Sequence, residues 1–133
     1  KNFINYLDYE RFGYAFDSII QSKDWVIEGQ NKTLFYLDKI NSLLKKNDIS
    51  LEIVYYPSAI DILKDNRDTK KSSHFKLLND WSISKNIPLI DTSNDFFKYS
   101  NAIENYKNNH ILCDMHWNLN GNKIIAENIL DRF

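Results

Sequence analysis

Glycine and proline are scarce in this 133-residue chain, which has three glycines, two prolines and one cysteine. A turn-dense all-β fold uses both residue types heavily, because Gly supplies positive φ and Pro fixes turn geometry. With Cys113 as the single cysteine, no disulfide can form within the chain, and cysteine usage does not report the redox compartment. No run of about 18 apolar residues occurs, so no membrane-spanning helix is predicted. These absences argue against an all-β fold, an internal disulfide framework and a membrane span.

The charges nearly cancel, with 17 basic and 18 acidic residues and a net charge of −1. Such a balance gives no general attraction to nucleic acid or to anionic lipid. Hydrophobic residues make up 43% of the chain, including three Trp, eight Tyr and eight Phe, so the composition is that of a folded domain. The length suits one domain. Because the chain begins at Lys1 without a signal-peptide pattern, we expect a fragment or processed product.

Apolar periodicity predicts alternating helices and strands. Residues 1–24 are expected to form a lead-in, and Thr33–Lys46 carries an apolar stripe at helical spacing. The β-branched and aromatic run Leu51–Tyr56 predicts the clearest strand, and Ile87–Asp91 predicts a second. Helices are further expected over Ser58–Lys64, from Ser73 with Phe75, Leu78 and Trp81 on one face, and within Asp91–Tyr99. Residues 100–113 are expected to be a polar loop, and Asn118 to cap a final helix whose core face carries Ile125, Ala126, Ile129 and Leu130.

This order of elements is typical of a parallel sheet covered by helices. We expect the two strands to be parallel neighbours joined by a right-handed crossover. Two strands are few for so many amphipathic helices, since sheets usually hold about four to six strands. The remaining strands are therefore expected before Lys1 or from a partner.

The segment Asp114-Met-His116-Trp117-Asn118 carries the most chemistry. In extended backbone, side chains at i and i+2 emerge on the same side, so Asp114 can lie beside the imidazole of His116. A serine hydrolase needs this arrangement, in which the acid orients the base. Trp117 and Asn118 are expected to fix the loop against the last helix and to contribute to substrate binding, and Gly121 to permit close helix packing.

Residues 116–126, which read His-Trp-Asn-Leu-Asn-Gly-Asn-Lys-Ile-Ile-Ala, resemble the C-terminal block of the SGNH, or GDSL-type, hydrolases. Leu51–Ser58 resembles the strand ending in Tyr-Pro of a bacterial branch of that family. Ile87–Asp91 followed by Phe96 resembles the segment that precedes the catalytic loop. The likeness covers residues 25–133, although Asp114 stands two residues before the histidine, where the commoner pattern has three and this chain has Cys113.

The resemblance implies a three-layer α/β/α (flavodoxin-like) fold and an ester hydrolase or O-acyltransferase that needs no cofactor. The substrate would be a small-molecule or carbohydrate ester, with O-acetylated carbohydrate the preferred candidate. His116 would be the base and Asp114 its orienting acid. The Gly-Asp-Ser block of the family is absent, so the nucleophile, and with it the N-terminal half of the domain, is expected upstream. The alternative is a non-catalytic SGNH-fold module for carbohydrate binding or assembly. A periplasmic or cell-envelope location follows from the resemblance alone.

Other candidates are weaker. Ser18, in Phe16-Asp17-Ser18, lacks the preceding glycine and buried strand of a nucleophile. His110, Cys113, Asp114 and His116 could form a zinc site, but structural sites rarely take every ligand from one short loop, and we predict no metal. His74 is expected to be a solvated surface residue. Tyr55 and Tyr56 alternate across a strand, and core packing is the expectation for both.

Overall fold

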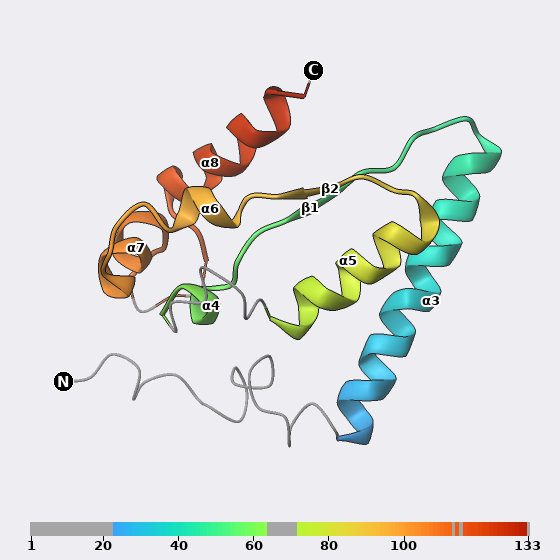
Figure 1. The fold of residues 1–133 in the computed structure, drawn as a ribbon, viewed down its shortest axis with the longest axis horizontal. Coiled ribbons are helices and arrows are strands. Elements are labelled where there is room, and N and C mark those ends of the chain that lie inside the picture. The colour runs from blue at the N-terminus through green and yellow to red at the C-terminus, as the bar shows by residue number, and fades with distance from the viewer. Residues whose placement is uncertain (1–22, 64–71, 113, 115, 133) are drawn as a thin grey trace. The chain divides into compact units, whose positions relative to one another are not determined.

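The computed structural model describes residues 23–63, 72–112, 114 and 116–132, and they form a mixed α/β structure that is mostly helical (Figure 1). Residues 1–22 of the expected lead-in, with Ser18, lie outside these residues, and Asp24 already belongs to a helix. In chain order the elements are α3 (Asp24–Lys46), β1 (Ile53–Tyr55), α4 (Ala59–Leu63), α5 (Ser73–Lys85), β2 (Leu89–Asp91), α6 (Ser93–Phe96), α7 (Ala102–Asn109) and α8 (Leu119–Leu130). The chain divides into two compact units, Lys1–Ile53 with Ser73–Pro88 and Val54–Ser72 with Leu89–Phe133.

Strands β1 and β2 are parallel neighbours, as expected, and form a two-stranded sheet. The Ile53 amide donates to the Pro88 carbonyl at 2.9 Å, and the Thr92 amide donates to the Tyr55 carbonyl at 3.0 Å. The Thr92 hydroxyl adds a second bond to the same carbonyl at 2.9 Å. The carboxyl ends of the two strands, Tyr55 and Asp91, therefore lie at the same edge of the sheet.

In the first unit, Asp38 links α3 to α5. The carboxylate of Asp38 on α3 accepts from the indole of Trp81 at 3.0 Å and pairs with Lys85 at 2.7 Å, both on α5. The bond from Lys85, followed by that from Trp81, lowers the pKa of Asp38. Trp81 is buried. In the expected apolar stripe of α3, Leu34, Leu37 and Leu44 are half-buried, whereas Ile40 is 48% and Leu43 61% exposed. Val26 and Asn41 are the fully buried residues of α3, so the periodicity predicted the helix correctly and the stripe is partly covered.

The second unit holds the candidate site. Helix α7 packs against α4 and α8, and α6 also packs against α8. Its core is formed by large side chains from β1, α4, β2, α6, α7 and α8, among them Tyr55, Ile62, Ile90, Phe96, Tyr106 and Ile124.

Helix α7 occupies a segment that was expected to be a polar loop. Its sequence is rich in Asn, Glu and Lys, and Tyr106 is its one large buried hydrophobic side chain. Two local features form the helix: the Asn101 side chain caps it by accepting from the amides of Ile103 and Glu104, and Asn105 bonds both backbone groups of Tyr99. The loop was expected because this segment has no apolar stripe; in the structure, buried asparagines form much of the inner face of the helix.

Helix α8 begins where predicted, after Asn118, but presents a different face. Gly121 and Ile124 are its buried residues. Ile125 and Ile129 are half-buried, whereas Ala126 is exposed and Leu130 is 68% exposed. The inner face is centred about one residue earlier than expected, because Gly121 sets where the helix touches α7.

Candidate functional site

The Asp114–His116 segment is a tight loop that joins α7 to α8. His110 and Trp117 form an isolated antiparallel bridge at its base. Within the loop, the Ile111 amide donates to the His116 carbonyl at 3.0 Å, and the Asp114 amide donates to the Ile111 carbonyl at 3.0 Å. Three residues of the loop, Ile111, Asp114 and His116, are thus tied by backbone bonds, which gives the two candidate catalytic side chains a defined frame.

The carboxylate of Asp114 contacts the imidazole of His116. One oxygen, Oδ1, lies 2.5 Å from Nδ1 of the ring and also accepts from the His116 amide at 2.9 Å. The side chain of His116 is 85% exposed and that of Asp114 is 45% exposed. An anionic acceptor at Nδ1 favours the tautomer with its proton on that nitrogen, which leaves the lone pair of Nε2 to accept a proton.

Trp117 contacts residues that follow both strands. Its ring meets that of Tyr56, the residue after β1, edge to face at 4.0 Å between centroids. It also lies 6.5 Å from the ring of Phe96 on α6, the short helix after β2. Ligands of open α/β sheets bind beyond the carboxyl ends of the strands. Tyr56 is 43% exposed, so its expected core packing is wrong, whereas that of Tyr55 is confirmed.

Asn118 locks the loop onto its two helices. Its Oδ1 caps α8 by accepting from the amides of Asn120 and Gly121, and its Nδ2 donates to the carbonyls of Asn108 at 3.0 Å and His110 at 3.2 Å. These four bonds use the full hydrogen-bonding capacity of an amide side chain. Asn118 therefore positions the loop, and its expected role in substrate binding stays a prediction.

Asn109 and Gly121 complete the support. The Asn109 side chain, 1% exposed, accepts from Nδ2 of Asn120 at 2.8 Å and donates to the Phe96 carbonyl at 3.2 Å. Its backbone carbonyl accepts the Asn118 amide at 3.1 Å. A Cβ at Gly121 would stand 2.4 Å from that carbonyl oxygen. Glycine is thus required here for close approach, as the sequence predicted.

Tyr106 and His110 lie beneath the loop, and sequence reasoning missed both roles. The Tyr106 hydroxyl lies 2.5 Å from the Asp114 carbonyl oxygen and 3.1 Å from that of Ile111. The ring of His110 stacks on Tyr106 at 5.0 Å, and neither of its nitrogens has a hydrogen-bond partner among the described residues. Burial lowers the pKa of His110 to about 4, an effect that the backbone of Tyr106 partly offsets. His110 is therefore neutral at physiological pH.

A second polar cluster lies where β1 ends. Ser58 and Asp61 form a capping box at the start of α4, in which Oδ2 of Asp61 accepts from the amide of Ser58 at 2.8 Å and from its hydroxyl at 2.7 Å. The buried hydroxyl of Tyr55 bonds to Ser72 at 3.0 Å. Burial, and next the charge of Asp61, raises the pKa of Tyr55. These bonds account for the local structure of α4.

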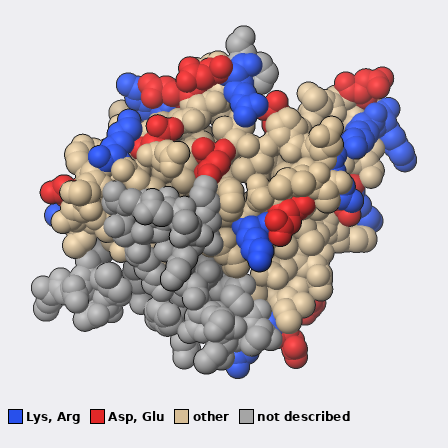
Figure 2. Space-filling view, in the orientation of Figure 1, with Lys and Arg blue, Asp and Glu red and all other residues tan. Residues whose placement is uncertain are grey.

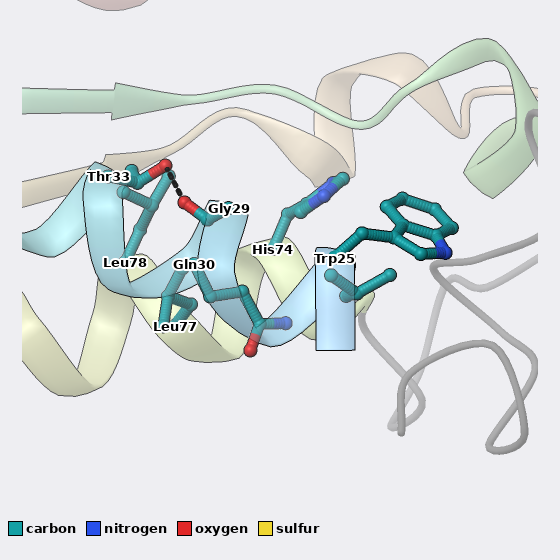
Figure 3. Close-up of a pocket in the computed structure, with 8 residues that line it drawn as sticks. Trp25, Gly29, Gln30, Thr33, His74, Leu77 and Leu78 are labelled. Carbon is teal, nitrogen blue, oxygen red and sulfur yellow. Dashed lines mark hydrogen bonds between the residues drawn. The ribbon is translucent and has the colours of Figure 1, made fainter. Parts of the chain in front are cut away.

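The remaining candidates from the sequence lie elsewhere. The described residues contain no group of His, Cys, Asp and Glu that could hold a metal ion, and Cys113 lies outside them. His74 is half-buried rather than solvated. It lines an apolar pocket of about 320 Å³ between α3 and α5, with Trp25, Leu77 and Leu78 (Figure 3).

The surface matches the balanced composition. On the face seen in Figure 2, basic and acidic side chains are interspersed rather than gathered by sign. Within the described ranges, no helix has both the length and the apolar character that a membrane crossing requires.

Comparison of the chain with protein-family models, with curated proteins and with solved structures gave no match. Function is therefore inferred from the residues and their geometry.

Proposed function

We propose that this chain carries the base and the orienting acid of an SGNH-type serine hydrolase or O-acyltransferase. His116 is the base that takes the proton of a serine through Nε2, and Asp114 holds the ring and stabilises the imidazolium that forms. The contact of 2.5 Å between Asp114 and Nδ1 of His116 is the observation that carries the proposal. The nucleophilic serine is supplied by residues other than those described.

The position of the pair supports this role. Trp117, the residue after His116, contacts Tyr56, which follows β1, and Phe96, on the helix that follows β2. The imidazole is 85% exposed, so its second nitrogen is accessible to a further group. Histidines that serve only packing are usually covered, as His110 is at 2% exposure.

The proposed domain is a three-layer α/β/α, flavodoxin-like fold in which β1 and β2 are two of the strands. The parallel pairing of these strands supports it. So do the uncovered apolar side chains of α3, of which Leu43 is 61% exposed, because a larger sheet would give such side chains a surface to cover. The proposed substrate is an ester, with O-acetylated carbohydrate the preferred class and transfer to another hydroxyl the variant reaction.

A non-catalytic carbohydrate-binding or assembly module of the same fold is the second candidate. The exposed ring of Tyr56 against Trp117 favours it, because aromatic faces with a polar edge suit ligands that are partly apolar and partly hydroxylated. In that case the Asp114–His116 contact would only shape the loop. Reactivity of a serine separates the two candidates.

The test is turnover of a small acyl ester, such as p-nitrophenyl acetate, by the full-length protein. His116→Ala should lower turnover at least about a thousandfold, and Asp114→Asn by as much or less, because triad members act as a unit. Both variants should fold normally, since both side chains are substantially exposed. His74→Ala is the matched control, because this histidine lies on α5 in the other unit, and it should keep wild-type activity.

Covalent labelling by a serine-directed phosphonate provides the second arm. The full-length protein should be labelled at one serine, and His116→Ala should suppress the labelling. The 133-residue chain should remain unlabelled, and labelling of Ser18 would contradict an upstream nucleophile. A full-length protein that neither hydrolyses esters nor reacts with the phosphonate would refute the hydrolase and leave the binding module.

A further inference from the structure

The Asp114–His116 contact is too exposed to maintain its own geometry. Its two side chains are 45% and 85% exposed, and exposed pairs of this kind contribute little because water and salt compete for both partners. A catalytic base must nevertheless be held within a narrow range of orientations. The restraint has to come from buried groups that act on the backbone of the loop.

Tyr106 is such a group. It is 1% exposed, and its hydroxyl reaches from α7 to the Asp114 carbonyl oxygen at 2.5 Å. The backbone amide of Asp114 donates to the Ile111 carbonyl at 3.0 Å, and that carbonyl oxygen lies 3.1 Å from the Tyr106 hydroxyl. Both backbone polar groups of Asp114 are therefore fixed, and the Tyr106 side chain ties them to α7.

The ring of Tyr106 is itself held in place. It stacks on His110 with the planes 9° apart, and the backbone of His110 bridges to Trp117 at the base of the loop. The His110 amide also donates to the Tyr106 carbonyl at 2.8 Å. The position of the Tyr106 ring is thus fixed by contacts other than those of its hydroxyl with the loop.

We propose that Tyr106 is the positioning residue of the Asp114–His116 pair. By fixing the Asp114 carbonyl, its hydroxyl keeps the carboxylate against Nδ1, and the carboxylate in turn selects the tautomer of His116 in which Nε2 accepts a proton. This inference rests on the proposed function for its purpose. Its geometry can be tested without any enzymatic activity.

The experiment measures the tautomer of His116 by long-range ¹H–¹⁵N NMR of the 133-residue chain labelled at histidine, at alkaline pH. The wild-type chain should show mainly the tautomer with the proton on Nδ1. In Tyr106→Phe the ratio of that tautomer to the Nε2–H tautomer should fall at least about threefold, because one hydrogen bond to the loop is lost. Asp114→Asn gives the reference for loss of the carboxylate.

Tyr36→Phe is the matched control. It removes the same hydroxyl from a side chain on α3 that is 60% exposed, and it should leave the tautomer of His116 unchanged. A residue with a purely structural role would lower thermal stability when changed and leave the tautomer as it is. An unchanged tautomer in Tyr106→Phe therefore overturns the proposal.

A second measurement on the wild-type chain covers the case in which Tyr106→Phe does not fold. A buried, hydrogen-bonded hydroxyl proton exchanges slowly with water, so the Tyr106 hydroxyl should give a separate proton signal with nuclear Overhauser contacts to the Asp114–Ile111 turn. Absence of such a signal refutes the proposal. Inactivity of the full-length protein toward esters would refute the hydrolase and leave these NMR results standing, and the two failures are therefore distinguishable.

Discussion

The contact between α8 and α7 at Gly121 makes the sharpest prediction about stability. A Cβ built at Gly121 stands 2.4 Å from the Asn109 carbonyl oxygen and 3.0 Å from Cβ of Trp117. Ordinary contact begins at 3.4 Å, so Gly121→Ala forces the start of α8 away from α7 by roughly 1 Å. The oxygen it displaces is the acceptor of the Asn118 amide at 3.1 Å. A shift of this size breaks that bond.

The expected magnitude combines three effects. Overpacking against a rigid backbone group costs about 1–3 kcal/mol. Loss of one backbone hydrogen bond costs about 0.5–1.5 kcal/mol. The better helix propensity of alanine offsets at most about 1 kcal/mol, and less in a first turn. Gly121→Ala should therefore lower the free energy of unfolding by about 0.5–4.5 kcal/mol, which corresponds to a fall in Tm of about 2–18 °C for a chain of this length.

Gly29→Ala is the matched control, and it should act in the opposite direction. Gly29 also lies inside a helix, α3, but a Cβ there meets nothing within 4 Å. Alanine should stabilise this position by about 0.5–1 kcal/mol. Thermal and urea unfolding followed by circular dichroism measure both variants. A Gly121→Ala chain as stable as wild type would refute the close contact, and equal shifts in both variants would refute the steric argument.

Two further predictions concern the support of the loop. Asn118→Ala removes the cap of α8 and two bonds to carbonyl groups, and it should lower the free energy of unfolding in urea by about 2–3 kcal/mol. Asn101→Ala removes the cap of α7 and should cost about 1 kcal/mol. Equal losses would contradict the bridging role of Asn118. Because the pKa of His110 falls to about 4 in the folded state, the unfolded chain binds the extra proton between about pH 6.5 and 4, and stability should decrease by about 2–3 kcal/mol as the pH falls through that range. His110→Phe keeps a ring against Tyr106 and should abolish this decrease in unfolding curves recorded from pH 4 to 7. If the variant loses stability in acid as the wild type does, other groups cause the loss.

Much of the local structure could be read from the sequence. The β-branched runs gave both strands and their parallel pairing, and Asn118 gave the start of the last helix. The i, i+2 spacing of Asp114 and His116 was enough to predict their contact, because such short-range geometry depends on the backbone of one loop. Gly121 was correctly assigned to close packing.

Helix α7 could not be read in the same way. Its inner face is built from Asn105, Tyr106 and Asn109, and a periodicity of apolar residues does not register buried amides. Those amides can be buried because they have hydrogen-bond partners on other segments, such as the Phe96 carbonyl for Asn109. Partners so far apart in the chain do not appear in any local sequence pattern.

The sequence by itself determined the order of the helices and strands other than α7, and the pair of side chains that could act as acid and base, because both follow from spacing along a short stretch of chain. Only the tertiary structure decided that the Tyr106 hydroxyl bonds to the Asp114 carbonyl, that Asn118 ties the loop to α7, and that Tyr56 lies beside Trp117. These roles depend on hydrogen bonds and ring contacts between elements that folding brings together, and a side chain's chemistry is assigned by the partners it meets there.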